Sequence, residues 1–315
     1  MIKFIEKNFA FLAILFSAVA LACPQSFIWI KPHIPKFLGV IMFGMGITLN
    51  FSDFKGVWQH KRLVITGIIM QYTIMPILAV MIALALNLPR ELMVGLIIVG
   101  ACPSGTASNV MSYMGKANLA LSVTLTLCTT LLAPLLTPAI IYLILSHKIA
   151  IPFWSMVSSV FWIVLFPLID GLIIRHLLYR RIKNIIPVFP SISILCILVI
   201  IACVVGLNQK LLLTFPALII FAVVLHNGFG LCLGYYIAKL LKAEEAEART
   251  LAFEVGLQNS GLGVTLAAKF FTVAAALPST IFSVWHNISG ILLAKWWALD
   301  KGKNLEQTPE KLLHN

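Results

Sequence analysis

Charged residues are scarce in this chain, and acidic residues are half as common as basic ones. Asp and Glu together number 11 in 315 residues, against 23 Lys and Arg. All charged residues make up 11% of the sequence and hydrophobic residues 60%, with a mean hydropathy of +1.00. So few polar side chains cannot cover the surface of a water-soluble domain. The composition therefore excludes a soluble globular protein and indicates a polytopic membrane protein.

The sequence also lacks the motifs of common hydrolytic and metal-dependent enzymes. It contains no HExxH, no GxSxG and no paired acids within an apolar segment, which argues against an intramembrane enzyme. Its six cysteines show no CxxC spacing and lie mostly in apolar segments. We therefore predict small buried cysteines rather than disulfides or metal ligands.

Long apolar segments dominate the sequence instead. A helix needs about 20 apolar residues to cross the hydrocarbon core of a bilayer. We predict an all-α protein with ten spans, at residues 9–28, 37–50, 64–86, 92–114, 119–146, 153–174, 188–207, 214–241, 250–273 and 279–299. The first of these is predicted to be a span rather than a cleaved signal.

The basic residues alternate between loops on the two sides of this topology. Of the 23 Lys and Arg residues, 17 fall on the side that carries both termini and 6 on the other side. The positive-inside rule then places both termini in the cytoplasm. The net charge of +12 reflects this topology and contact with membrane lipid, not nucleic-acid binding.

Ten spans divide into two halves of five, residues 1–147 and 151–300, followed by a cytoplasmic tail at 301–315. Because five is odd, the halves have opposite orientations, and such inverted repeats hold a transport site near the midplane. Gln71 in the third span and His226-Asn227 in the eighth are matching polar features.

The fourth and ninth spans each contain a polar interruption, at residues 102–109 and 254–263. Pro103 predicts a kink or gap in the fourth span. Glu254 costs about 2.5–3.5 kcal/mol at bilayer depth on insertion scales, and a carboxylate beside free backbone carbonyls suits a hard cation. Two broken helices in corresponding positions indicate a transport site. The alternative is a kinked bundle packed through small residues.

Five motifs in order along the chain resemble the bile acid:sodium symporter family, in particular bacterial homologues of the apical sodium-dependent bile acid transporter. They are FGMGITL at 43–49, PSGTASNVM at 103–111, APLLTP at 133–138, EVGLQNSG at 254–261 and SVWHNISG at 283–290. The resemblance covers nearly the whole chain and implies ten spans in two inverted repeats, with broken spans four and nine crossing. The same resemblance implies a location in a bacterial cytoplasmic (inner) membrane. It also implies a panel of spans 1, 2, 6 and 7 and a core of spans 3, 4, 5, 8, 9 and 10.

The resemblance further implies two sodium ions and an organic anion as substrate. The first ion is expected at Ser108, Asn109, Ser122, Thr126 and Glu254. The second is expected at Gln71, Glu254, Val255, Leu257 and Gln258, through main-chain oxygens at Val255 and Leu257. The anion is expected near Thr106, Ser108, His286 and Asn287.

Ser104 and Leu257 depart from the family pattern, since relatives often have Gly and Met there; neither change removes a side-chain ligand. We therefore expect sodium-coupled symport by alternating access, with a bile acid or a small carboxylate such as pantoate as substrate and no obligate protein partner. A proton-coupled transporter or antiporter of similar broken-helix fold is the alternative.

Overall fold

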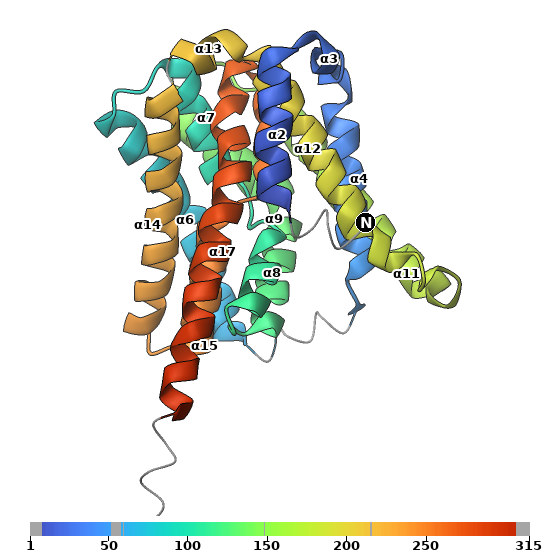
Figure 1. Ribbon diagram of the computed structural model, residues 1–315, viewed down its shortest axis with the longest axis vertical. Helices are drawn as coiled ribbons and strands as arrows, with labels where there is room; N and C mark the ends of the chain where they lie inside the picture. Colours follow the sequence, from blue (N-terminus) through green and yellow to red (C-terminus); the bar gives the residue numbers. More distant parts are fainter. Residues whose placement is uncertain (1–7, 52–57, 59, 148, 215, 307–315) are drawn as a thin grey trace, which may run out of the picture.

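The computed structural model describes residues 8–51, 58, 60–147, 149–214 and 216–306, and no strand occurs among them (Figure 1). The all-α prediction is confirmed for this part of the chain. The helices are α2 (Phe9–Ala22), α3 (Gln25–Ile28), α4 (Ile34–Thr48), α6 (Lys61–Ala85), α7 (Arg90–Gly100), α8 (Ala107–Met114), α9 (Leu119–Leu145), α10 (Phe153–Val160), α11 (Phe166–Ile182), α12 (Phe189–Leu207), α13 (Gln209–Thr214), α14 (Pro216–Leu240), α15 (Glu245–Gly256), α16 (Ser260–Phe270) and α17 (Leu277–Glu306). A π-helical turn, Phe161–Leu165, joins α10 to α11.

Among the described residues, five helices are long and apolar enough to cross a membrane: Lys61–Ala85, Leu119–Leu145, Phe153–Ile182, Ile186–Leu207 and Ala217–Leu240. A sixth candidate is the pair Phe11–Ala22 and Gln25–Thr48, which is bent by 111°. The chain is thus a multi-pass helical protein. The full set of ten spans stays a prediction, because the fourth and ninth segments are each divided into two shorter helices and α17 carries His286, Asn287 and Ser289 in its apolar part.

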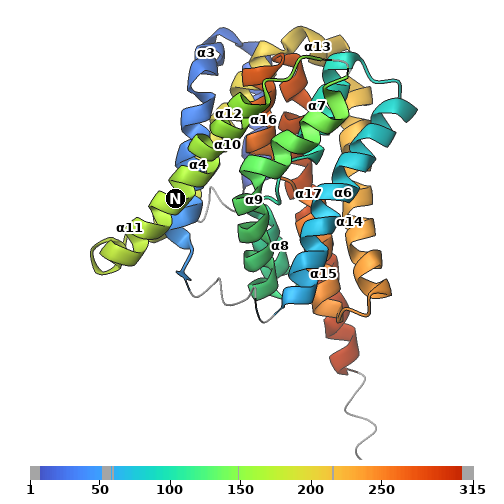
Figure 2. The same ribbon diagram turned by 180° about the vertical axis from the view of Figure 1, so that it is seen from behind.

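Helices α2, α4, α11 and α12 pack together on one side of the molecule, where α4 contacts both α11 and α12 (Figures 1 and 2). The crossing of α4 and α11 is close. A Cβ added to Gly46 would lie 2.0 Å from the backbone oxygen of Leu168, and one added to Gly171 would lie 2.5 Å from that of Phe43. Backbones that approach this closely require glycine at the contact.

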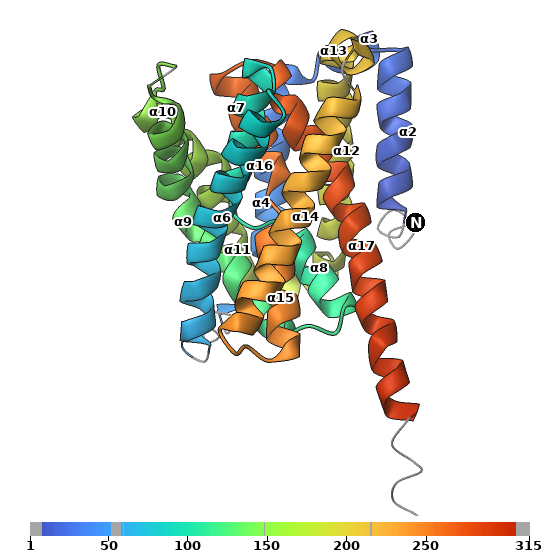
Figure 3. The same ribbon diagram turned by 90° about the vertical axis from the view of Figure 1, so that its left-hand side faces the viewer.

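Helices α6, α7, α9, α14, α15 and α17 form a second group, in which α14 contacts α6, α15 and α17 (Figure 3). The two groups meet where α12 contacts α17. They are also joined by α10, which continues into α11 and contacts α9, and by α16, which contacts α7 and α17 of the second group and α4 of the first. The interruptions between α7 and α8 and between α15 and α16 lie in the second group. The fold therefore places both polar interruptions among packed helices.

The start of α6 and the ends of α11, α14 and α17 lie toward the same end of the molecule, opposite α3 and α13 (Figures 1 and 3). These helix ends carry Lys61, Arg62, Arg180, Arg181 and Lys239. The arrangement agrees with the alternation of basic loops in the sequence. Residues 1–7, 52–57 and 307–315, which carry further charges and most of the predicted tail, lie outside the described part of the chain.

The close crossing of α4 and α11 predicts the effect of Gly46→Ala. The added methyl group meets the backbone of Leu168, so we expect a loss of about 1–3 kcal/mol of stability, seen as a lower thermal midpoint in detergent. Gly228→Ala in α14 is the matched control, because nothing lies within 4 Å of its added Cβ. Helix propensity favours alanine there by up to about 1 kcal/mol. An equal loss of stability in both variants would contradict the close crossing.

Candidate functional site

The two interrupted helices, α7 with α8 and α15 with α16, cross each other at their breaks. Their backbones pair with each other at this crossing. The amide of Gly105 donates to the Leu257 oxygen at 2.8 Å, and the amide of Asn259 donates to the Pro103 oxygen at 2.8 Å. Ser104 and Gln258 form an isolated antiparallel bridge between these contacts. Each break thus satisfies backbone groups that the other leaves free. Non-helical backbone at membrane depth needs such partners, because no water reaches it there.

Two amide side chains hold the carbonyl ends of the broken helices. Gln71 on α6 donates through Nε2 to the Cys102 oxygen at 2.8 Å, and Asn227 on α14 donates through Nδ2 to the Gly256 oxygen at 2.9 Å. Ser289 on α17 in turn donates to Oδ1 of Asn227 at 2.7 Å. Asn227 and Ser289 were not among the predicted site residues. The sequence feature that points to Asn227 is the polar pair His226-Asn227 within an apolar span.

Hydroxyl groups from α8 and α9 surround the carboxylate of Glu254. Its Oε1 accepts from Ser108 Oγ at 2.5 Å and from Ser122 Oγ at 2.6 Å, and Thr126 Oγ1 lies 3.0 Å from both carboxylate oxygens. The amide oxygen of Asn109 lies 2.9 Å from Ser122 Oγ and 3.3 Å from Thr126 Oγ1, and is an alternative acceptor for their protons. The structure thus brings all five residues predicted for the first sodium site together.

The negative charge of this cluster has no basic partner within the described residues. Glu254 is 2% exposed, and the ion pairs in the described part of the chain join Glu245 to Lys239 and to Arg249. Ser108, Ser122 and Thr126 are each 0% exposed and neutral. A buried carboxylate held only by neutral groups is costly, and a cation among these oxygens would offset that cost.

The residues predicted for the second sodium site are brought together in part. Gln71 Nε2 donates to Gln258 Oε1 at 2.7 Å, and Gln258 Nε2 donates to the Val255 oxygen at 2.8 Å. Gln71 Oε1 is buried and has no hydrogen-bond partner among the described residues. The Leu257 oxygen, in contrast, accepts from Gly105, and the carboxylate of Glu254 is bonded to the hydroxyl cluster.

The residues predicted for the substrate are more dispersed. Thr106 is exposed at the start of α8, whereas Ser108 is buried against Glu254. On α17, Asn287 Nδ2 donates to the Ser283 oxygen at 2.8 Å, and His286 is 4% exposed and packs on Phe282. Helices α8 and α17 contact each other, but no hydrogen bond joins Thr106 to His286 or Asn287 in the described structure.

Ser104 lies at the crossing of the two interrupted helices. It is 1% exposed, and its Oγ lies 3.4 Å from the Leu257 oxygen and 3.5 Å from Ser108 Oγ. The Ser104 hydroxyl therefore faces the opposite break of the crossing.

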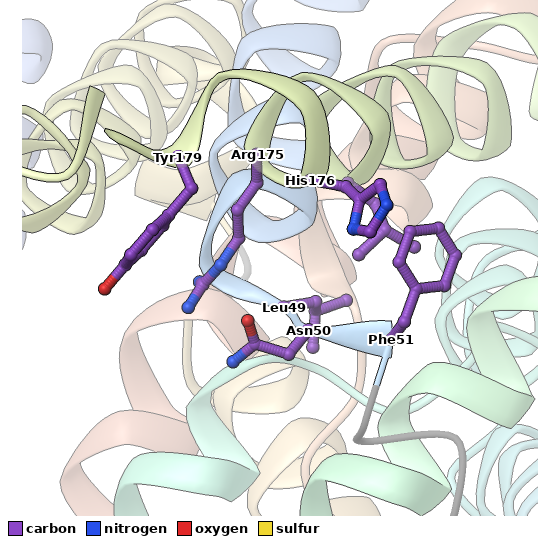
Figure 4. Close-up of a pocket in the computed structure, with 7 residues that line it drawn as sticks. Leu49, Asn50, Phe51, Arg175, His176 and Tyr179 are labelled. Atoms are coloured by element: carbon purple, nitrogen blue, oxygen red, sulfur yellow. The ribbon is translucent and has the colours of Figure 1, made fainter. Parts of the chain in front are cut away.

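A pocket of about 300 Å³ lies away from these residues, at the end of α4 and the second half of α11 (Figure 4). Arg175 points there toward the end of α4 and donates through one nitrogen to the oxygens of Ile47 and Thr48. Phe51 stacks edge-on against His176. The guanidinium satisfies carbonyls that the end of α4 leaves free, so this arrangement fastens α4 to α11.

Comparison with known proteins identifies the family of this chain. The family profile described as the Sodium Bile acid symporter family matches residues 35–215, more than half of the chain. The "Uncharacterized sodium-dependent transporter YocS" of Bacillus subtilis (strain 168) is 44% identical over 295 residues, which cover 94% of this chain and 92% of that protein. The chain belongs to the sodium bile acid symporter family.

Plant relatives show the same relationship at lower identity. The "Probable sodium/metabolite cotransporter BASS1, chloroplastic" of Arabidopsis thaliana is 33% identical over 90% of this chain and 71% of its own length. The "Probable sodium/metabolite cotransporter BASS2, chloroplastic" of Oryza sativa subsp. japonica is 32% identical over 94% of this chain and 71% of its own length. These relatives are named as transporters or cotransporters, which confirms the family resemblance and the prediction that the chain is not an enzyme.

The backbone pairing at the crossing predicts the effect of Gly105→Ala. An added Cβ would lie 2.6 Å from the Gln258 oxygen, so the two breaks must separate, at a cost of about 1–3 kcal/mol. We expect the fully buried thiol of Cys102, three residues away, to react faster with a thiol reagent, measured on its own peptide by mass spectrometry. Gly228→Ala serves as the control. Unchanged reactivity of Cys102 in Gly105→Ala would show that the crossing tolerates the methyl group.

Proposed function

We propose that the protein is a secondary active transporter that carries an organic anion together with sodium by alternating access. The observation that carries the proposal is the buried carboxylate of Glu254, which α15 presents to three hydroxyl groups of α8 and α9 beside the crossing of the two broken helices. One carboxylate among neutral oxygens gives a site of single negative charge, which suits a small monovalent cation with a preference for oxygen.

The hydroxyl groups around Glu254 have other acceptors for their protons besides its carboxylate. Ser108 Oγ lies 2.8 Å from the Gly105 oxygen, and Ser122 Oγ lies 2.9 Å from Asn109 Oδ1. A hydroxyl can rotate and keeps lone pairs free while it donates. When sodium enters, these protons turn toward Gly105 and Asn109, so that the hydroxyl oxygens face the ion. No side chain needs to move far.

The second proposed ion is held by Gln71, Gln258, Glu254 and the main-chain oxygens of Val255 and Leu257. The supporting observation is the buried Gln71 Oε1, which lacks a partner among the described residues although its Nε2 makes two hydrogen bonds. An oxygen buried without a partner loses the solvation it has in water, and a cation restores it. In this proposal Glu254 serves both ions.

Paired contacts support two inverted repeats of five spans, at 1–147 and 151–300. Gln71 in the third span bonds the carbonyl end of the fourth, as Asn227 in the eighth bonds that of the ninth. Ser283 of the tenth span also donates to Ser260 of the ninth at 2.6 Å. In the first half, Thr126 of the fifth span lies 3.2 Å from Ser108 of the fourth, and Ser122 accepts from Ser112 at 3.1 Å. We assign spans 1, 2, 6 and 7 to a panel and the other six to a core.

The basic helix ends lie toward one end of the molecule. This supports an inner-membrane protein with both ends of its chain in the cytoplasm.

The anion, a bile acid or a small carboxylate such as pantoate, would bind between core and panel near Thr106, Ser108, His286 and Asn287. The exposed start of α8 favours negative charge there. Two sodium ions moved with one monoanion carry one net charge, for which the membrane potential contributes roughly 2.3 kcal/mol per 100 mV.

Glu254→Gln should abolish sodium-dependent uptake, because the variant keeps the size of the side chain but removes the charge that attracts the ion. The measurements are taurocholate and pantoate uptake into proteoliposomes and the rise of the thermal midpoint with sodium. Glu245→Gln on the same helix is the matched control and should keep both responses, since Glu245 pairs with Lys239 and Arg249 instead. Uptake that follows a proton gradient and ignores sodium would favour the proton-coupled alternative.

The two ion sites should separate in the sodium dependence of uptake. Thr126→Val at the first site and Gln71→Leu at the second should each raise the sodium concentration for half-maximal uptake roughly tenfold, since each removes one ligand to a charged group. Each should also reduce the steepness of the sodium curve. The control Thr130→Val removes a hydroxyl on the same helix that bonds only the Thr126 oxygen. If Thr126→Val and Thr130→Val behave alike, the hydroxyl of Thr126 is not a ligand.

A further inference from the structure

A second pocket, of about 320 Å³, lies between the start of α4 and the end of α16, at the end of the molecule opposite the basic helix termini. Figure 2 shows α16 in the upper half of the bundle. The pocket has an apolar wall that includes Pro32, Ile34, Pro35 and Ala268, and two basic residues, Lys31 and Lys269. Its volume falls in the range of small-molecule sites, which combine apolar walls with a few polar groups.

The ammonium group of Lys269 is held at this pocket by another helix. It donates to Ser159 Oγ on α10 at 2.8 Å, and Ser159 is 7% exposed. An ammonium group has three donors, so two remain for a ligand. Neither Lys269 nor Lys31 takes part in an ion pair within the described residues, where both ion pairs involve Glu245.

The charge at this end of the molecule favours anions. The described loops and helix ends on this side carry five basic residues, at 31, 36, 90, 210 and 269, and one acidic residue, Glu91. A local excess of positive charge raises the concentration and the association rate of an anionic ligand. An apolar pocket with two lysines in such a field suits an amphipathic anion.

A continuous seam between α4 and α16 leads from this pocket toward the crossing. On α4, Pro35 lies at the pocket, and Leu38 and Met42 follow at helical spacing on the same face. A Cβ added to Gly261 of α16 would lie 3.2 Å from Leu38, and Asn259 Nδ2 lies 3.9 Å from Met42 Sδ. Leu38 and Met42 are 0% and 2% exposed, so they close the seam between the pocket and the broken helices.

We propose that this pocket is an outer receiving site for the transported organic anion, separate from the site at the crossing. A carboxylate or sulfonate binds the ammonium groups of Lys31 and Lys269, and the apolar body of the ligand packs on Pro32, Ile34, Pro35 and Ala268. Separation of α4 from α16 then opens the seam below it. This inference rests on the proposed function, because it gives the anion its route to the crossing.

The first test is the concentration dependence of taurocholate uptake at fixed saturating sodium. Lys31→Gln and Lys269→Gln should each raise KM about 5–10-fold, the effect of losing a charged hydrogen-bond donor, and should leave kcat and the sodium dependence unchanged. Lys36→Gln removes the same charge at the same end outside the pocket and should change KM less than about twofold, because exposed charges are screened by salt. Equal effects of Lys36→Gln and Lys269→Gln, or a loss confined to kcat, would overturn the receiving site.

The second test does not depend on transport. Lysines of the purified protein are acetylated with an amine-reactive reagent in sodium-free buffer, with and without taurocholate, and the modified fraction is measured by mass spectrometry. Taurocholate should protect Lys31 and Lys269 but not Lys36, in wild type and in Glu254→Gln alike.

The two tests distinguish failure of this inference from failure of the proposed function. Equal acetylation of the three lysines with and without taurocholate overturns the receiving site, whatever sodium does to uptake. Protection of Lys31 and Lys269 without any sodium-dependent uptake supports the pocket and overturns the coupling instead.

Discussion

The backbone pairing between the two interrupted helices is the constraint on which the rest of the core depends. Each break exposes amides and carbonyls that a bilayer cannot hydrate, and the pairing of Gly105 with Leu257 and of Asn259 with Pro103 satisfies them. Once the breaks are fixed side by side, Glu254 is close to α8 and α9, whose hydroxyl groups surround it. The geometry of the buried charge is therefore a consequence of the crossing.

The types of residue at the site can be predicted from the sequence more readily than the contacts these residues make in three dimensions. Pro103 and Glu254 in apolar segments are visible without a structure, because each carries a known cost at membrane depth. Ser122 and Thr126 share a helix face, and they do meet Glu254. The bond from Asn227 to Gly256 was not predictable, since it joins residues whose proximity is set by packing of α14 on α15.

Hydropathy alone does not settle the number of membrane spans in this protein. Length and apolar composition identify continuous helices such as α6 and α14. None of α7, α8, α15 and α16 is long enough alone, because each interruption divides one predicted span, 92–114 or 250–273, into two short helices. Polar interruptions therefore lower the hydropathy signal at the very segments that form the candidate site. The breaks are better identified by proline, glycine and carboxylate positions than by apolar length.

The contacts of α4 differ on its two sides, and this difference bears on how the proposed transporter moves. Toward α11, Gly46 and Gly171 bring backbones into direct contact and Arg175 bonds the end of α4, so the two helices form one rigid unit. Toward α16, the contacts are the side chains of Leu38 and Met42 against Gly261 and Asn259. Parting α4 from α16 breaks one weak hydrogen bond, from Asn259 Nδ2 to Met42 Sδ, whereas parting α4 from α11 would expose the carbonyls that Arg175 holds. In the proposed transporter, movement of the core against the panel would therefore be easiest along the seam between α4 and α16, which leads from the outer pocket toward the crossing.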